Sequence, residues 1–448
     1  MRLLTSAEWP RDRALVVCVW VAFVIWCLNG LFLDIRNATI YPERNDLSAY
    51  VAAARVKRDQ GQGIHDRDKV LAAGRLAGVP DQARPYFYPP PLAEALVVTA
   101  DVPFLKIRIA WTILTYLAVI TLFALVIQIV RSRGASALVS TLVAFGVFVS
   151  YSPIQREIYY GQATLFCLTL TAAAFLLDMR GRSVIEGAAA GLATIIKIYP
   201  GVLFVGFALQ RRWLAIAAGI AAMVLIAAVS LTSYGSADWF SFFGIHTAAH
   251  GEVSAANLYS DPAQRYLNAP NYSLSQVLYL WTRAVGLTVP PNALATIARA
   301  ALVVGAIAFL WYFRRQLRES NSLTLWCHAV MLFFLPFSLV FWNHIFVFYL
   351  PGIVLTGVAL LGAPAGGSLA GRSVARAAPP GLWMVWIAGV ALMGLVDYAP
   401  NIEFLNRPPL LIFKPLKFYG LVIHGFAFGW MLRNGLLSAP PQAVAAQA

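Results

Sequence analysis

The chain has 448 residues, of which 60% are hydrophobic and only 12% are charged, and its mean hydropathy is +0.69. An average soluble domain carries about 25% charged residues, so this composition excludes an ordinary soluble protein. The net charge of +14 does not indicate nucleic-acid binding, because the arginines form small clusters between apolar runs and no single basic face. We expect one membrane-embedded domain, residues 1–448, in contact with the lipid bilayer.

The apolar runs predict an all-α, polytopic membrane protein with about ten full transmembrane helices. Each run approaches the roughly 20 residues that a bilayer-spanning helix needs. Arginines place both termini in the cytoplasm, and we interpret the first run as an uncleaved span because no small-residue cleavage site follows it. The predicted spans are approximately residues 14–33, 107–130, 136–152, 163–179, 213–232, 293–313, 323–341, 344–362, 381–398 and 416–432.

Three longer polar stretches, at about 34–106, 233–292 and 399–414, are predicted to lie outside the cytoplasm, and a brief external loop at 153–162 joins two spans. The first stretch contains the aromatic and proline cluster Tyr86–Pro91, and we expect short interfacial helices in it. The unusual polar residues of the chain map to this outer side, which indicates that any chemistry faces outward.

The apolar run 184–210 cannot be a straight span. Arg182 precedes it and Arg211 follows it, and basic residues prefer the cytoplasm at both ends. The segment Lys197–Gly201 interrupts the run with a proline, which removes a backbone donor, and a glycine, which frees the turn. We predict a broken-helix hairpin with Lys197 near its tip, a place where irregular backbone must lie inside protein or beside a wet cavity. Because a charge at membrane depth is energetically costly, Lys197 is a candidate functional residue.

Asp46 follows the first span and has two possible roles. Aspartate is a favoured N-cap residue, here for a helix over 47–58, although Asn45 could fill that position instead. A carboxylate at this place could also take a proton from a hydroxyl group as the hydroxyl attacks. The residues alone leave both roles open, and Glu157 is the carboxylate to test next if Asp46 is not a base.

Three cationic or titratable residues, Arg156, Lys197 and His344, also map to the outer half of the chain. An external arginine is commonly interfacial, and a lone histidine is commonly a hydrogen-bonded core residue. Arginine and lysine also bind lipid phosphates, and fixed cations lower the barrier when a departing phosphate gains negative charge. The four cysteines show no metal-ligand spacing. We predict no metal site and no cofactor, and the absence of a phosphate-binding loop argues against a nucleotide-sugar donor.

Several short motifs, in their order and spacing, resemble glycosyltransferase family 87, whose members are polytopic, lipid-sugar-dependent enzymes of the GT-C type. The motifs span residues 46–344, most of the chain. They are Asn45–Tyr50, Phe87–Pro90, Gly161–Thr164, Lys197–Pro200, Asn271–Leu274 and Trp342–His344.

The resemblance implies a GT-C-type fold with Asp46 as the general base and Arg156, Lys197 and His344 near the donor phosphate. It implies inverting transfer of mannose from a polyprenyl-phosphate-linked donor to a membrane glycolipid or polysaccharide acceptor, on the extracytoplasmic side of a bacterial inner membrane. Our weaker candidates for the sugar pocket are Tyr50, Tyr88, Gln162 and Asn271.

Two alternatives to mannose transfer remain open. The first is transfer of arabinofuranose or of another pentose or hexose, since Ile345 follows His344 where many family members have a second histidine. The second is a lipid or sugar transporter (a flippase), which would need polar cavity residues towards both membrane faces. The sequence places them towards one face, which favours the glycosyltransferase.

Overall fold

The computed structural model describes the chain in seven stretches, and every regular element in them is helical, which confirms the predicted all-α class. Asn45, Asn271 and Trp342, three residues of the predicted motifs, lie outside the described residues. The described stretches are residues 10–40, 46–76, 86–248, 272–337, 343–361, 379–394 and 403–437.

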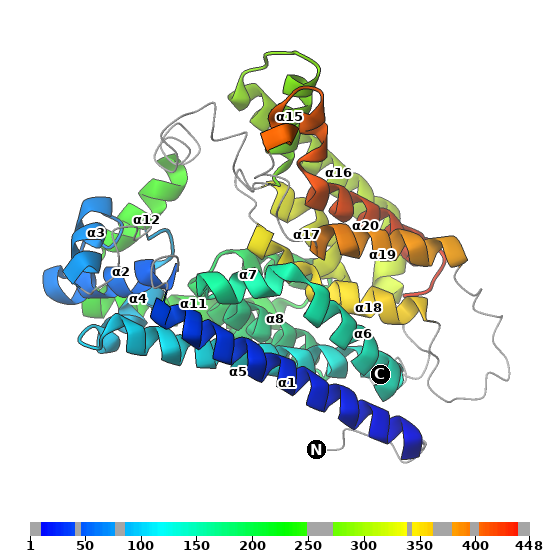
Figure 1. Ribbon diagram of the computed structural model, residues 1–448, viewed down its shortest axis with the longest axis horizontal. Coiled ribbons are helices and arrows are strands. Elements are labelled where there is room, and N and C mark those ends of the chain that lie inside the picture. The colour runs from blue at the N-terminus through cyan, green and yellow to red at the C-terminus, as the bar shows by residue number, and fades with distance from the viewer. Residues whose placement is uncertain are drawn as a thin grey trace.

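The long helices run along the body of the molecule, where α1 and α5 lie side by side (Figure 1). Four described helices are long and apolar enough to cross a membrane: α1 (Pro10–Ile40), α5 (Phe104–Arg131), α11 (Trp213–Tyr234) and α16 (Pro291–Glu319). The pair α6 (Ala137–Ser150) and α7 (Ser152–Tyr160), bent by 55°, makes a fifth candidate. Our expectation of ten full spans therefore exceeds the four or five described helices of spanning length.

The other predicted spans correspond to shorter apolar helices. These are α8 (Thr164–Met179), α17 (Leu323–Phe337), α18 (Leu350–Leu360), α19 (Pro380–Gly394) and α20 (Leu416–Arg433), while α9 (Ser183–Ile196) and α10 (Val202–Leu209) cover the run predicted as a hairpin. The predicted span at 344–362 begins with a 3₁₀ helix, η3 (Asn343–Tyr349), before α18. Beyond α17, the short helix α15 (Leu274–Ala284) lies at the top of Figure 1, against η6 (Leu410–Phe413).

The predicted loop at 153–162 was wrong in one respect, because Ser152–Tyr160 forms helix α7. Pro153 stands in the first turn, where its missing N–H costs nothing. Gly161 ends the helix in a left-handed conformation, with φ of 63°.

The predicted hairpin is present. α9 ends at Ile196, the short 3₁₀ helix η2 (Tyr199–Gly201) follows, and α10 runs back. Glu186 at the start of α9 and Arg212 after the end of α10 approach to 3.5 Å, so the two legs begin and end at the same place. Lys197 is at the break, as expected.

Glycine allows the closest helix contacts. A Cβ atom added to Gly191 of α9 would lie 2.3 Å from the backbone oxygen of Gly219 in α11, and Gly187 approaches Ala215 in the same way. Such small-residue contacts drive helix association where surrounding lipid is as apolar as the side chains. The hairpin is thereby held against α11.

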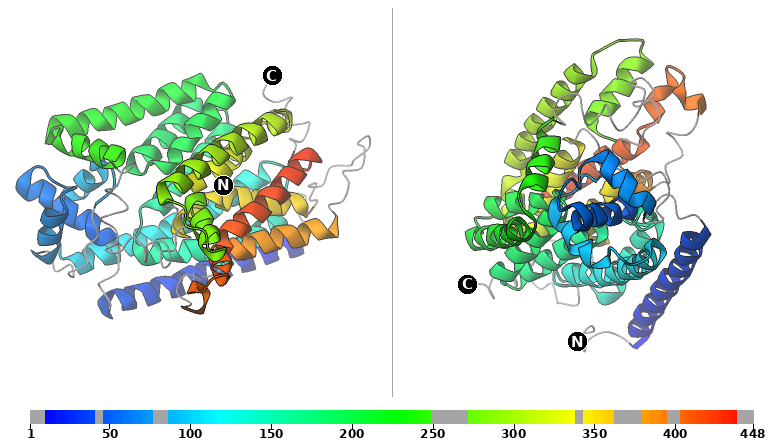
Figure 2. Two further views of the ribbon diagram at one scale, coloured as in Figure 1. Left: turned by 90° about the horizontal axis from the view of Figure 1, so that it is seen from above. Right: turned by 90° about the vertical axis from the view of Figure 1, so that its left-hand side faces the viewer.

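At one end of the body lies a cap of short helices drawn from the first two predicted loops (Figures 1 and 2). It contains α2 (Leu47–Gln60), α3 (Arg67–Leu76), α4 (Pro90–Leu96) and α12 (Ala237–Ala248). Within it, the buried Lys57 ammonium donates to the buried Asp238 carboxylate at 2.5 Å, and Asp238 also accepts from the Gly63 amide. The buried ion pair joins the first loop to the start of the second.

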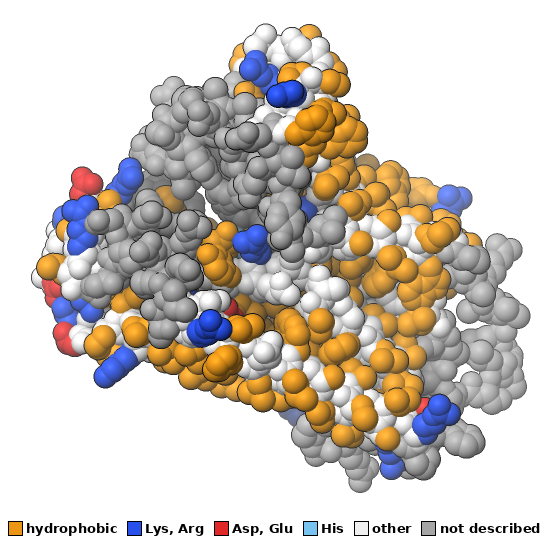
Figure 3. All heavy atoms as spheres, in the orientation of Figure 1, with side chains coloured by type: hydrophobic (Ala, Val, Ile, Leu, Met, Phe, Trp, Pro, Cys, Tyr) orange, Lys and Arg blue, Asp and Glu red, His pale blue; other side chains and the backbone are white. Residues whose placement is uncertain are grey.

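Apolar side chains cover much of the middle of the face in Figure 3, and lysines and arginines gather towards the ends. Three long helices leave most of their apolar windows uncovered, since only 17% of the window is buried in α1 and in α11 and 11% in α16. These surfaces are typical of lipid-facing helices. At the end opposite the cap, Arg180 after α8 bonds to Gln128 of α5 at 3.2 Å, Arg133 after α5 bonds to the Ser320 carbonyl after α16 at 3.0 Å, and Arg212 after α10 pairs with Asp178 of α8. We call this the arginine-rich end.

Candidate active site

Asp46 stands immediately before α2, at its N-cap position, and is 6% exposed. Its side chain makes no capping hydrogen bond, and its backbone is helical instead of extended. Gln162 donates through Nε2 to Asp46 Oδ2, while the Asp46 N–H donates to the Tyr160 carbonyl at 2.6 Å. The Asp46 carboxylate therefore does not cap α2, and it is held by Gln162 instead.

Gln162 is the centre of the site. It lies between α7 and α8 and is 2% exposed. Its Oε1 accepts from Tyr50 OH at 3.0 Å, Tyr88 OH at 2.6 Å and Lys197 Nζ at 3.1 Å. Burial raises the pKa of the Tyr50 phenol well above its usual range, so Tyr50 is a neutral donor at physiological pH. Since the orientation of Gln162 leaves its Nε2 facing Asp46, one side chain connects the carboxylate to the ammonium.

Lys197 is buried inside the protein at the hairpin break, with 5% of its surface exposed. The backbone there is extended, with φ of −151° and ψ of 130°, which turns the side chain away from the axis of α9. Its ammonium also donates to Thr164 Oγ1 and lies 5.4 Å from the ring centre of Tyr88. Its hydrogen-bond and ring partners are neutral amide, hydroxyl and aromatic groups.

Glu157 also belongs to this region, and our sequence analysis kept it only as a substitute for Asp46. It is fully buried on α7, and Thr164 lies close to its carboxylate. Lys197 acts on it by charge attraction and Asp46 by repulsion. The sequence did carry a signal for its burial: Ile154 and Ile158, on either side of Glu157, are four residues apart, the spacing of one buried helix face.

His344 lies at the edge of this cluster, and Arg156 lies on the helix that leads to it. The half-buried His344 ring, at the start of η3, is 6.1 Å from the ring centre of Tyr160, whose carbonyl binds Asp46. Arg156 is half-buried on α7, one turn before Tyr160 and on the same face. The structure thus brings together Asp46, Gln162, Tyr50, Tyr88 and Lys197, places His344 next to them through Tyr160, and leaves Asn271 undescribed.

The arrangement supplies two chemical groups in a buried setting: a carboxylate that can accept a proton and an ammonium that can balance an anion. In a site shielded from water, both act more strongly than in bulk solvent. Within the described residues, no group of three or more His, Cys, Asp or Glu could hold a metal ion.

Comparison with known proteins identifies the family. The sequence profile of glycosyltransferase family 87 matches residues 86–338, more than half of the chain. The polyprenol-phosphate-mannose-dependent alpha-(1-2)-phosphatidylinositol mannoside mannosyltransferase of Mycobacterium tuberculosis is 25% identical over 392 residues, which cover 83% of this chain and 82% of that protein. The chain belongs to glycosyltransferase family 87. It is therefore a glycosyltransferase, as the motifs predicted.

Two crystal structures of ArnT from Cupriavidus metallidurans are similar to the chain at 15% sequence identity. The apo structure has a TM-score of 0.38 and covers 94% of this chain and 77% of that chain. The structure bound to undecaprenyl phosphate has a TM-score of 0.33 and covers 93% of this chain and 77% of that chain.

Proposed function

We propose that this glycosyltransferase transfers mannose from polyprenyl-phosphate-mannose to a hydroxyl group of a membrane glycolipid or polysaccharide, with inversion at the anomeric carbon. One observation carries the proposal: the Asp46 carboxylate and the Lys197 ammonium are both buried and are joined by the single side chain of Gln162. The donor named for the Mycobacterium tuberculosis relative supports the choice of mannose on a polyprenol phosphate.

Asp46 acts as the general base. The acceptor oxygen attacks the anomeric carbon while the bond from that carbon to the phosphate oxygen breaks, and the hydroxyl proton passes to Asp46. The Gln162 amide and the Tyr160 carbonyl fix the position of Asp46 from two sides. Fixing the base in this way contributes to the rate because the reacting groups need not be ordered at the moment of reaction.

Lys197 balances the charge of the departing polyprenyl phosphate, and Arg156 and His344 assist from the edge of the site. Gln162 Oε1 has three donors but only two lone pairs. Lys197 can therefore turn one N–H towards a phosphate oxygen while both tyrosines keep Gln162 satisfied. The exchange replaces a neutral acceptor by a charged one, which is the stronger bond.

Tyr50, Tyr88, Gln162 and Asn271 shape the sugar pocket in this proposal, and the chain adopts a GT-C-type fold with about ten spans and the broken hairpin. We place the protein in the bacterial inner membrane, with both termini cytoplasmic and the site extracytoplasmic. The arginine-rich end, opposite the cap that carries Asp46, supports this orientation.

The test is transfer of labelled mannose from polyprenyl-phosphate-mannose to a membrane lipid extract. It compares purified wild type, Asp46→Asn and the control Asp59→Asn, which changes an exposed acid on the same helix. Loss of a general base lowers the rate by about 10²–10⁴-fold, so we expect that loss in Asp46→Asn and none in Asp59→Asn. GDP-mannose should not replace the lipid donor.

Equal rates for wild type and Asp46→Asn would remove Asp46 from the mechanism and make Glu157 the carboxylate to test. Transfer from a decaprenyl-phosphate arabinofuranose donor, but not from the mannose donor, would keep the mechanism and change the sugar. A folded protein that transfers from no lipid-linked sugar, and instead moves such a lipid between leaflets, would refute the proposed donor chemistry.

A further inference from the structure

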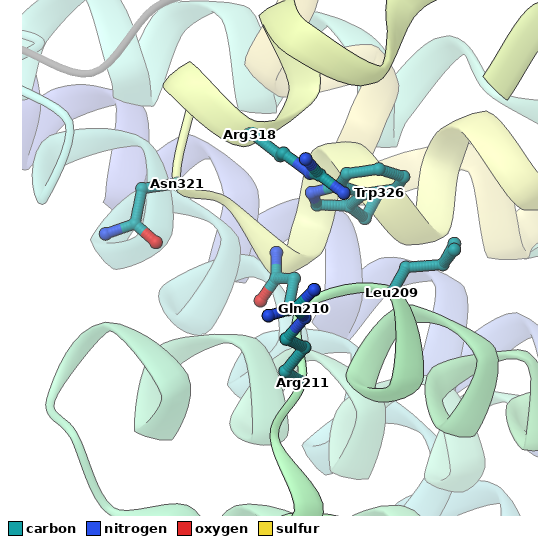
Figure 4. Close-up of a pocket in the computed structure, with 6 residues that line it drawn as sticks. All are labelled: Leu209, Gln210, Arg211, Arg318, Asn321 and Trp326. Carbon is teal, nitrogen blue, oxygen red and sulfur yellow. The ribbon is translucent and has the colours of Figure 1, made fainter. Parts of the chain in front are cut away.

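A cavity of about 330 Å³ opens at the arginine-rich end, away from every residue of the candidate active site (Figure 4). It lies where the end of α10 meets the turn between α16 and α17. Its lining residues are Leu209, Gln210, Arg211, Arg318, Asn321 and Trp326. Leu209 and Trp326 supply apolar surface, and the other four lining side chains carry N–H donors.

Within the described part of the chain, the two arginines of the cavity, Arg211 and Arg318, have neither an ion pair nor an aromatic ring beneath them, whereas neighbouring arginines have one or the other. On α16, Arg314 lies over the Trp311 ring at 3.6 Å, and Arg315 pairs with Glu319 at 2.7 Å. Arg318, on the same helix, makes neither kind of contact with any residue that the structure describes. Simple anchoring at a membrane surface accounts for the first two arginines, but it does not explain why Arg318 faces a cavity.

The same contrast holds at the end of α10. Arg212 pairs with both Asp178 and Glu186, whereas Arg211 has no ion pair among the described residues and lines the cavity. Figure 4 shows the Arg211 and Gln210 side chains together on one wall, opposite Arg318 and Trp326.

Gln210 adds a donor that is buried and unpaired. Its Oε1 accepts from Arg212 Nε at 2.8 Å, which fixes the orientation of the amide. Its Nε2 is buried and has no acceptor among the described residues. In Figure 4 this nitrogen points into the space between the two walls. An unmade hydrogen bond of a buried donor is costly, and an anion in the cavity would supply the missing acceptor.

The backbone of Arg211 is also held in a costly conformation. Its φ is 58°, and α10 ends in a turn in which Arg212 N–H donates to Phe207 O and Arg211 N–H donates to Ala208 O. α8 ends in the same kind of turn, with Gly181 at the equivalent position and a φ of 67°. Glycine is the unstrained residue there. An arginine at position 211 therefore lowers the free energy of unfolding relative to a glycine at the same position.

We propose that this cavity binds a phosphate group, and that an anionic phospholipid headgroup at the arginine-rich face of the membrane is its natural source. Two guanidinium groups and one amide N–H₂ surround the cavity, and arginine binds phosphate in a bidentate manner. Trp213 and Trp311, which are 63% and 69% exposed, flank Arg212 and Arg314, as aromatic side chains do at the headgroup level of a bilayer. The inference does not depend on the transfer reaction.

The test measures thermal unfolding of purified protein in a neutral detergent, by tryptophan fluorescence. Phosphatidylglycerol, phosphatidylcholine with the same acyl chains, and inorganic phosphate are each titrated into wild type, Arg318→Gln, Arg211→Gly and Arg315→Gln. Arg315→Gln is the matched control, because it removes the same charge from the same helix outside the cavity. Losing one guanidinium should weaken phosphate binding roughly ten- to hundredfold.

We expect phosphatidylglycerol to raise the unfolding midpoint of wild type and Arg315→Gln, and to have little effect on the two cavity variants. Arg211→Gly relieves the left-handed strain, so its midpoint without lipid should equal or exceed that of wild type, and its loss of response cannot reflect misfolding. The same pattern with inorganic phosphate alone would assign the site to a soluble phosphate. Equal responses to both lipids, or equal weakening in Arg315→Gln and Arg318→Gln, would overturn the proposal.

Discussion

Replacing Gln162 by methionine would remove the polar centre of the site while nearly keeping its volume. Two buried groups would lose their partners. Asp46 would lose the amide donor to its carboxylate, and the fully buried Tyr50 hydroxyl would lose its acceptor. Tyr88 is half-buried and can turn to another acceptor, and Lys197 keeps Thr164.

The expected destabilisation follows from these two losses. A hydrogen bond to a charged group contributes about 1.5–3 kcal/mol, and a buried donor left unpaired costs about 1–3 kcal/mol. The sum is roughly 2.5–6 kcal/mol, and because both groups share one partner the measured value should fall in the lower half of that range. The transfer rate should also fall by about 10²-fold, since the Asp46 carboxylate would lose the amide donor that positions it.

The assay is equilibrium unfolding of the purified protein, read beside transfer from polyprenyl-phosphate-mannose. Gln155→Met is the control, because Gln155 is exposed on α7 and its replacement should stay within about 0.5 kcal/mol. A Gln162→Met protein that is less than about 1 kcal/mol less stable than wild type, and that transfers at the normal rate, would refute the central role of this residue.

Two further changes test the scaffold. Lys57→Met leaves the buried Asp238 carboxylate without its cation, so unfolding should become easier by about 3–5 kcal/mol, and a loss below about 1 kcal/mol in chemical denaturation would contradict a buried ion pair. Gly191→Ala places a Cβ against the Gly219 carbonyl and should destabilise by about 1–3 kcal/mol, whereas Gly146→Ala, with no atom within 4 Å of its added Cβ, should be neutral or stabilising. Equal midpoints for the two alanine variants would show that α9 and α11 are not in close contact.

The helical class and the broken hairpin could be predicted because their causes are local in sequence. A run of apolar residues is visible without knowing its neighbours, and the conflict between Arg182 and Arg211 arises from charges at the two ends of one segment. Lys197 was identified by the same reasoning. A proline and a glycine beside a lysine, within an apolar run, already indicate a break that must be buried in protein.

The central position of Gln162 could not be read in this way, and the sequence analysis ranked it among the weaker candidates. Its role depends on Asp46, 116 positions away, and on Tyr88, 74 positions away. The N-cap question at Asp46 was undecidable for a related reason. Propensity describes what an aspartate does at the start of an isolated helix, whereas here a distant amide takes the carboxylate.

Helix α7, which the sequence analysis predicted as a loop, had local signals in the sequence. Its helical structure determines how the candidate base is held. Arg156 and Glu157 interrupt the apolar pattern, so the stretch suggested a loop. Yet Pro153 in the first turn and Gly161 at the end are the usual boundaries of a helix. Because the stretch is helical, Tyr160 ends a rigid element and presents its carbonyl to the Asp46 N–H. The candidate base is thus fixed through its backbone by one helix end and through its side chain by the turn that follows, which accounts for its burial and its orientation.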